Sequence, residues 1–203
     1  MAERVGEIIE SGSTQFVAQC YRLHSPPPLG SLVRVGDDER DILGVVSDAS
    51  TGALQPGRRP IARGSEEASD EDVYVHNPQL DKLLRTLFQV LIVGHTVGGS
   101  GSDGGRGEMV YQHLPPQPPK IHAFVYACDE GEVGLFSESL DFLHLLINAG
   151  APAGDELISA CLRFLSRSQP DPRAYLLRAG KELSLLLAGE PQRLGSVLKG
   201  IRP

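Results

Sequence analysis

The first fifty residues consist of short apolar runs separated by tight-turn signals, and this pattern restricts the possible folds more than any other feature of the chain. The runs from Val5 to Ile9 and from Gln15 to Tyr21 are rich in β-branched and aromatic residues, and Ser11-Gly12-Ser13 separates them. This spacing is typical of a β-hairpin. Two further runs, Ser31 to Val35 and Asp41 to Ser47, follow a proline-rich interruption. Because no helical pattern separates these four strands, we expect antiparallel pairing and closure into a small barrel, which removes exposed strand edges.

The barrel domain is expected to span residues 1–136, with an insertion at about residues 55–87. Asn77-Pro78, followed by leucines at helical spacing, predicts a short amphipathic helix over residues 77–87. Further strands are expected at residues 88–93, 108–113 and 121–127. An acidic run in the insertion is interpreted as solvated surface; it comprises Glu66, Glu67, Asp70, Glu71 and Asp72.

Residues 137–203 have a helical pattern, so the predicted fold class is α+β: a barrel followed by a C-terminal helical bundle. Helices are expected at about residues 140–147, 155–167 and 174–188, with a short fourth from 192 to 200. A unit of about 65 residues is marginal alone, so we expect it to pack on the barrel or on another subunit. The apolar stripe of the third helix is the candidate partner-binding site, although such leucines more often form core; it comprises Leu176, Leu177, Leu183, Leu186 and Leu187.

The formal net charge of −7 is concentrated in the barrel domain, because residues 137–203 carry 8 Lys and Arg against 7 Asp and Glu. An acidic barrel argues against a nucleic-acid surface there, since duplex binding depends on neutralising phosphates. No segment approaches the roughly 20 apolar residues of a membrane span. The cysteines Cys20, Cys128 and Cys161 are far apart and are expected to be free thiols, so a cytoplasmic location is expected.

No catalytic motif is complete, and we expect neither enzymatic activity nor a cofactor or metal. Gly99 to Gly104 matches GxGxxG, but a strand pattern follows where a dinucleotide site needs a helix. No GxxxxGK[ST] occurs: Glu182 follows Gly180-Lys181 where serine or threonine is required. The histidines lack metal-binding spacing, although His95 and His113 flank the glycine-rich loop.

The barrel segments resemble a known family, the HAS barrel of HerA-type DNA translocases and rotary ATP synthase subunits. The similar strings are RVGEIIESGSTQFVAQCYR (4–22), LGSLVRVGDDERDILGVVSDASTG (29–52), QVLIVGH (89–95) and LPPQPPKIHAFVYACDEGEVGLF (114–136). In that family an ATPase core follows the barrel, whereas short helices follow it here. The resemblance therefore implies the accessory role of these barrels, which pack in a ring or bind a partner such as a nuclease.

These observations lead to three hypotheses from different classes. The leading one is a non-catalytic module that binds protein partners, either its own copies or a motor ATPase or nuclease. The second is an accessory subunit of a DNA-processing machine that contacts DNA through helical arginines. The third is an enzyme whose pocket combines His95, His113, Asp103 and Glu108. The arginines of the second hypothesis would have to share one face; they are Arg163, Arg167, Arg173, Arg178 and Arg193.

Overall fold

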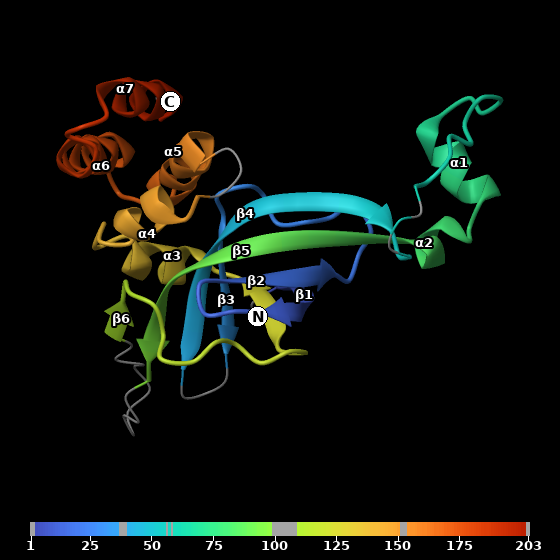
Figure 1. Ribbon diagram of the computed structural model, residues 1–203, viewed down its shortest axis with the longest axis horizontal. Helices are drawn as coiled ribbons and strands as arrows, with labels where there is room; N and C mark the ends of the chain where they lie inside the picture. Colours follow the sequence, from blue (N-terminus) through green and yellow to red (C-terminus); the bar gives the residue numbers. More distant parts are fainter. Residues whose placement is uncertain are drawn as a thin grey trace.

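Figure 1 shows the computed structural model, which describes residues 3–36, 40–55, 57, 59–98, 109–150 and 154–201. Six strands close into an antiparallel barrel in the order β2-β1-β7-β3-β4-β5, with β5 pairing back to β2. The expected α+β fold with an antiparallel barrel and a C-terminal helical region is therefore confirmed. A further strand, β6 (Met109–Tyr111), pairs with the outer end of β5. The barrel strands are β1 (Arg4–Ser11), β2 (Gln15–Cys20), β3 (Leu32–Gly36), β4 (Asp41–Ala53), β5 (Leu84–Val97) and β7 (Phe124–Ala127).

The barrel interior is filled by alternate residues of these strands, as the two-residue period of a strand requires. In β2, for example, Phe16, Ala18 and Cys20 are buried and the residues between them are not. Strands β4 and β5 differ, because residues 41–47 and 90–96 are buried on both faces. The interior core comprises Ile8, Phe16, Ala18, Cys20, Val33, Val35, Ile42, Val46, Phe88, Val90, Ile92 and Val125.

A second core lies between the outer face of the barrel and the helical region. Leu43 and Val45 of β4, together with Leu91 and Val93 of β5, pack there against apolar side chains of the helices. This arrangement explains why β4 and β5 are buried on both faces. The helical region, which packs on its own barrel, comprises α3 (Glu130–Phe136), α4 (Leu143–Asn148), α5 (Gly154–Ser166), α6 (Pro172–Leu186) and α7 (Pro191–Gly200).

The helices agree with the sequence expectation except for α3, which lies within the segment assigned to the barrel. Asp129 begins it with a capping box, in which its carboxylate accepts from the backbone N–H of Glu132 while the Glu132 side chain accepts from that of Asp129. Among the described residues, no helix has both the length and the apolar character needed to cross a membrane.

The predicted helix over residues 77–87 was wrong in its bounds. The segment instead holds two short helices, α1 (Asp70–His76) and α2 (Leu80–Leu83), and β5 begins at Leu84. Asn77 ends α1 rather than starting a helix. The leucine spacing at 84 and 87 was misleading, because both residues pair in a strand with β4. We define residues 54–83 as the insertion; the hairpin of β4 and β5 carries it at the opposite end of the molecule from α6 and α7 (Figure 1).

Candidate functional site

Helices α6 and α7 and the C-terminal end of α5 form a groove of about 1120 Å³. Its apolar surface comes from Leu176 and Leu177 of α6 together with Leu198 and Ile201 at the end of α7. We call this cavity the helical groove. Its full lining is Arg163, Ser166, Arg167, Asp171, Pro172, Arg173, Leu176, Leu177, Gly180, Lys181, Ser184, Leu198 and Ile201.

Helix α6 is held in place by its first turn and by a buried face. Its N-terminus is capped by Asp171, whose carboxylate accepts from the backbone N–H of Ala174, and proline follows the cap. The buried face consists of Tyr175, Ala179 and Leu183, which pack into the second core. The neighbouring face therefore points into the helical groove.

The five leucines predicted as a partner-binding stripe do not share one face. Leu183 and Leu187 are buried in the second core, so they are not available to a partner in this structure. Leu176 is partly buried at the groove, whereas Leu177 is 61% exposed and lines it; Leu186 is exposed but does not line the groove.

Sequence reasoning missed Leu198 and Ile201, because their place in the groove depends on how α7 packs against α6. It also missed Leu185, whose side chain is 73% exposed outside the groove. One signal was available in the sequence. Leu177, Lys181 and Ser184 are spaced by four and three residues, so they share one face of a helix, and this face differs from the core face.

The rim of the helical groove is basic. Arg167, Arg173 and Lys181 are exposed, and none of them forms an ion pair with any described residue. Arg163 differs, because its guanidinium binds Glu156 at 2.7 Å and also donates to the backbone oxygen of Gly200. Three cations at the groove are thus free to bind an anionic group.

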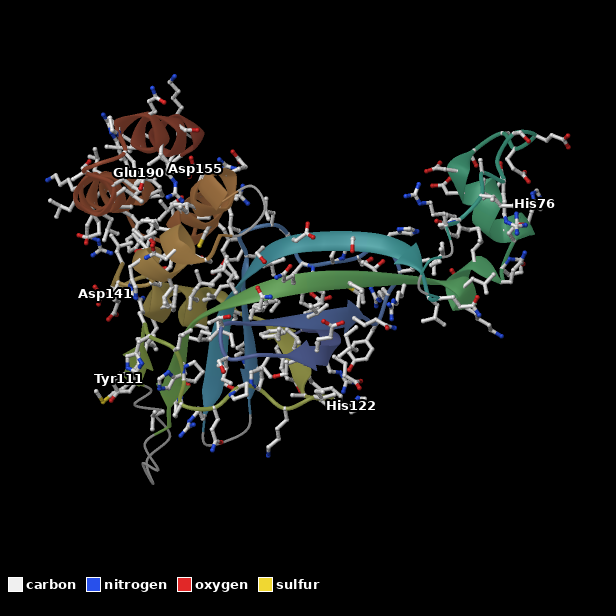
Figure 2. The ribbon with its side chains drawn as sticks, viewed as in Figure 1. His76, Tyr111, His122, Asp141, Asp155 and Glu190 are labelled. Atoms are coloured by element: carbon white, nitrogen blue, oxygen red, sulfur yellow. The ribbon has the colours of Figure 1, made fainter. Side chains whose placement is uncertain are left out.

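The other two arginines of the DNA-binding hypothesis serve the fold and do not line the groove. Arg193 pairs with Asp155 at 2.6 Å, which holds α7 against α5, and Figure 2 labels Asp155 and Glu190 in this part of the molecule. Arg178 donates to the backbone oxygen of Ser137 at 2.8 Å. Only Arg163, Arg167 and Arg173 of that set meet at one cavity.

The turn that links α3 to α4 is held by one buried side chain, Gln112. Its amide Nε2 donates to the backbone oxygens of Phe136 and Ser139, at 2.6 and 3.3 Å. Its Oε1 accepts from the backbone N–H of Phe142 at 2.9 Å. A single amide therefore satisfies three backbone groups that would otherwise be buried without partners.

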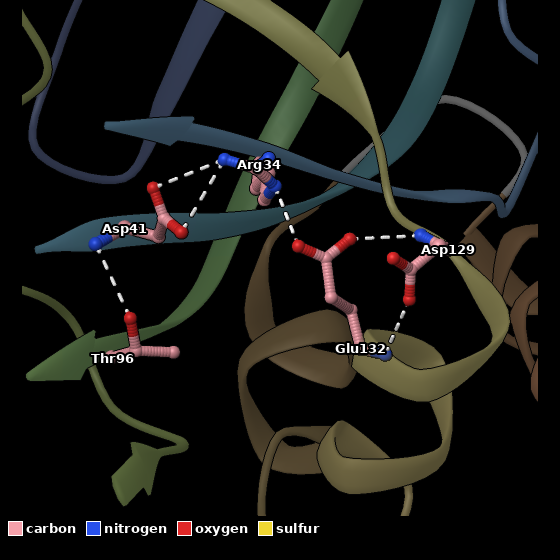
Figure 3. A network of polar contacts seen from close by, with 5 residues as sticks. All are labelled: Arg34, Asp41, Thr96, Asp129 and Glu132. Carbon is pink, nitrogen blue, oxygen red and sulfur yellow. Dashed lines mark hydrogen bonds and ion pairs between the residues drawn. The ribbon is translucent and has the colours of Figure 1, made fainter. Parts of the chain in front are cut away.

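A charged network joins the barrel to the helical region (Figure 3). Arg34 of β3 lies between Asp41 of β4, with Nη1 3.4 Å from Oδ1, and Glu132 of α3, with Nε 2.7 Å from Oε1. Burial lowers the pKa of Arg34, but Asp41 and Glu132 outweigh burial and hold it above its usual value. Since each charge has an opposite partner, we interpret this network as a structural joint.

His95 and His113 do come together, with ring centroids 5.0 Å apart, and Tyr111 stacks on His95. Burial lowers the pKa of His95, which favours the neutral ring. Asp103, Glu108 and the GxGxxG motif of residues 99–104 lie outside the described residues. Within the described part of the chain, no group of three or more His, Cys, Asp or Glu side chains could hold a metal ion.

The free cysteines are expected to react slowly in the folded protein. Burial raises the pKa of Cys20 to about 11 and holds the pKa of Cys128 and Cys161 above the usual value. At pH 8 the thiolate fraction of Cys20 is then about a hundredfold below that of a free cysteine. We expect a thiol-reactive dye to label the native protein much more slowly, by roughly tenfold or more, than the urea-unfolded protein, which should react at all 3 cysteines. Rapid labelling of any cysteine in the native state would contradict this expectation.

In comparisons with known proteins, no family model matches the chain and no curated protein is significantly similar to it in sequence.

Proposed function

We propose that this protein is a non-catalytic interaction and assembly module whose helical groove binds an acidic, amphipathic segment of a protein partner. The observation that carries this proposal is the chemistry of the groove, where an exposed leucine lies beside basic side chains that form no ion pair with any residue the structure describes. Leu177 offers an apolar anchor point, and Arg167, Arg173 and Lys181 surround it with positive charge. A segment with apolar residues on one side and carboxylates beside them matches both features.

The apolar part of the groove favours a protein partner over DNA. Protein–DNA interfaces are polar and strongly positive, and their affinity comes mainly from phosphate contacts. Here Leu176, Leu177, Leu198 and Ile201 provide a large share of the lining, and Asp171 adds a negative charge. The resemblance to HAS barrels supports the same reading, because it implies an accessory role beside a motor or nuclease.

A photo-cross-linking amino acid placed at position 177 tests the proposal in cells of the native host. We expect it to yield adducts whose cross-linked peptides are acidic segments of one protein. The same probe at Leu135, which is 37% exposed on α3 and does not line the groove, is the matched control.

The double variant Arg167→Glu/Arg173→Glu should abolish the adduct at position 177, because it reverses the charge of the groove. Equal labelling from positions 177 and 135, or an adduct that persists in the double variant, would contradict the proposal. The DNA-contacting alternative makes a different prediction. The parent protein would bind a DNA duplex with an affinity that falls steeply as salt is raised, and the double variant would lose this binding.

A further inference from the structure

The insertion has no core of its own. None of the described residues from 48 to 85 is buried, and neither α1 nor α2 contains a buried side chain. Helix α1 is held by its cap at Ser69 and by a hydrogen bond of 2.6 Å between Tyr74 and His24, which lies outside the insertion. A seven-residue helix without a packed face is marginal in water, so this part of the chain lacks the apolar contacts that normally stabilise a helix.

Both the insertion and α6 carry strongly exposed apolar side chains. Ile61 and Val75 in the insertion are 73% and 71% exposed, and Leu185 and Leu177 on α6 are 73% and 61% exposed. Of these side chains, Leu177 lies at the helical groove, and Ile61 and Val75 offer apolar surface on the insertion.

The charges of these two surfaces are opposite. The insertion carries five carboxylates between residues 66 and 72, and three of them, Asp70, Glu71 and Asp72, lie in the first turn of α1. The rim of the helical groove carries the cations Arg167, Arg173 and Lys181, which form no ion pair within the described part of the chain. The acidic run of residues 66–72 therefore complements the basic rim of the groove, and the insertion as a whole is acidic, with six carboxylates against four basic side chains.

One molecule cannot bring these two surfaces together. The insertion and helices α6 and α7 lie at opposite ends of the longest axis of the molecule, with the barrel between them (Figure 1). Figure 2 shows the same separation through His76, which lies in the insertion, and Asp155, which lies beside the helices of the other end. The complementary charges can meet only between two molecules.

We propose that the partner of the helical groove is a second copy of this chain, whose acidic insertion occupies the groove. This inference rests on the proposed function, because it names the partner of the same groove. Ile61 and Val75 of one copy provide the apolar contact with Leu177 and Leu198 of the next, and the carboxylates face the basic rim. Such a contact is heterologous, so each added copy presents a new groove or a new insertion unless the arrangement closes on itself.

Sedimentation velocity of the purified full chain, at about 1 to 200 µM and at about 50 mM salt, tests the inference directly. We expect the average mass to rise with protein concentration and to fall when salt is raised to about 500 mM. Two charge-reversed variants are compared, the groove variant Arg167→Glu/Arg173→Glu and the insertion variant Glu66→Lys/Glu71→Lys. All four side chains are exposed, so both variants should fold.

Each variant alone should associate about tenfold or more weakly than the parent chain, because like charges then face each other. An equimolar mixture should recover association, since the reversed groove of one variant fits the reversed insertion of the other. The matched control Glu138→Lys/Lys199→Glu changes exposed charges outside both surfaces and should associate like the parent.

A parent chain that stays monomeric over the whole concentration range would overturn the inference, as would a mixture of the two variants that fails to recover association. A monomeric chain that still gives a charge-dependent cross-link from position 177 to a different protein would overturn only the second-copy partner. Failure of that cross-link as well would overturn the proposed function itself.

Discussion

Replacing Gly30 with alanine is expected to lower the free energy of unfolding by about 2–5 kcal/mol, from backbone strain and overpacking together. Gly30 has φ of +79°, in the left-handed region that disfavours a side chain. A Cβ atom there would also lie 2.5 Å from the backbone nitrogen of Cys161 and 2.6 Å from the carbonyl carbon of Ala160. Neither backbone atom can move without displacing α5 from the barrel, so we expect a clear shift in the urea unfolding midpoint.

Gly57→Ala is the matched control, because Gly57 has the same φ of +79° but no atom within 4 Å of the added Cβ. We expect it to cost only the conformational strain, about 1 kcal/mol. The difference between the two variants therefore measures the close contact between the loop before β3 and helix α5. Equal effects of the two substitutions would show that this contact contributes nothing.

Replacing Gln112 with glutamate is expected to destabilise the protein by about 3 kcal/mol or more. The substitution preserves the size of the side chain and the oxygen that accepts from Phe142. It replaces the donating amide with a carboxylate oxygen, which would face the backbone oxygens of Phe136 and Ser139 inside the protein. Urea unfolding followed by circular dichroism measures the loss, and Gln117→Glu, at an exposed glutamine, is the control.

The loss should depend on pH in a defined direction. Burial against carbonyl oxygens raises the pKa of the new carboxyl in the folded state, so the folded state binds a proton more strongly than the unfolded state. The destabilisation relative to the parent should therefore shrink as the pH falls from about 7 toward 5 and grow as the pH rises. A variant as stable as the parent at pH 7 would show that Gln112 does not hold the turn between α3 and α4.

Local patterns predicted the barrel strands and most of the helical region. The alternation at Phe16, Ala18 and Cys20 reflects one buried and one open face of β2, which a single sequence can reveal. The expected helices at about 155–167 and 174–188 correspond to α5 and α6, and the break between them is local, because the cap residue Asp171 and Pro172 start α6 within one turn. The capping box that begins α3 was equally local and could have been found at Asp129 and Glu132.

The helical groove could not be predicted, because it depends on which face of α6 packs inward. Leu183 and Leu187 lie on the core face, whereas Leu176 lies between that face and the groove and Leu177 is exposed in the groove. The role of Gln112 was also hidden, since its partners are backbone groups at residues 136, 139 and 142. Every residue type has the same backbone groups, so a contact with distant backbone atoms cannot be recognised from the sequence.

Strands β4 and β5 contribute side chains to both cores, so the chain cannot be cut between the barrel and the helices without exposing apolar surface. Truncation after the barrel would expose Leu43, Val45, Leu91 and Val93 to water on one continuous sheet face. Such a patch favours aggregation. The barrel and the helices are thus thermodynamically inseparable, since melting either core withdraws support from the same two strands. In evolution, too, this barrel could have lost or exchanged its neighbour only together with a change on its own outer face.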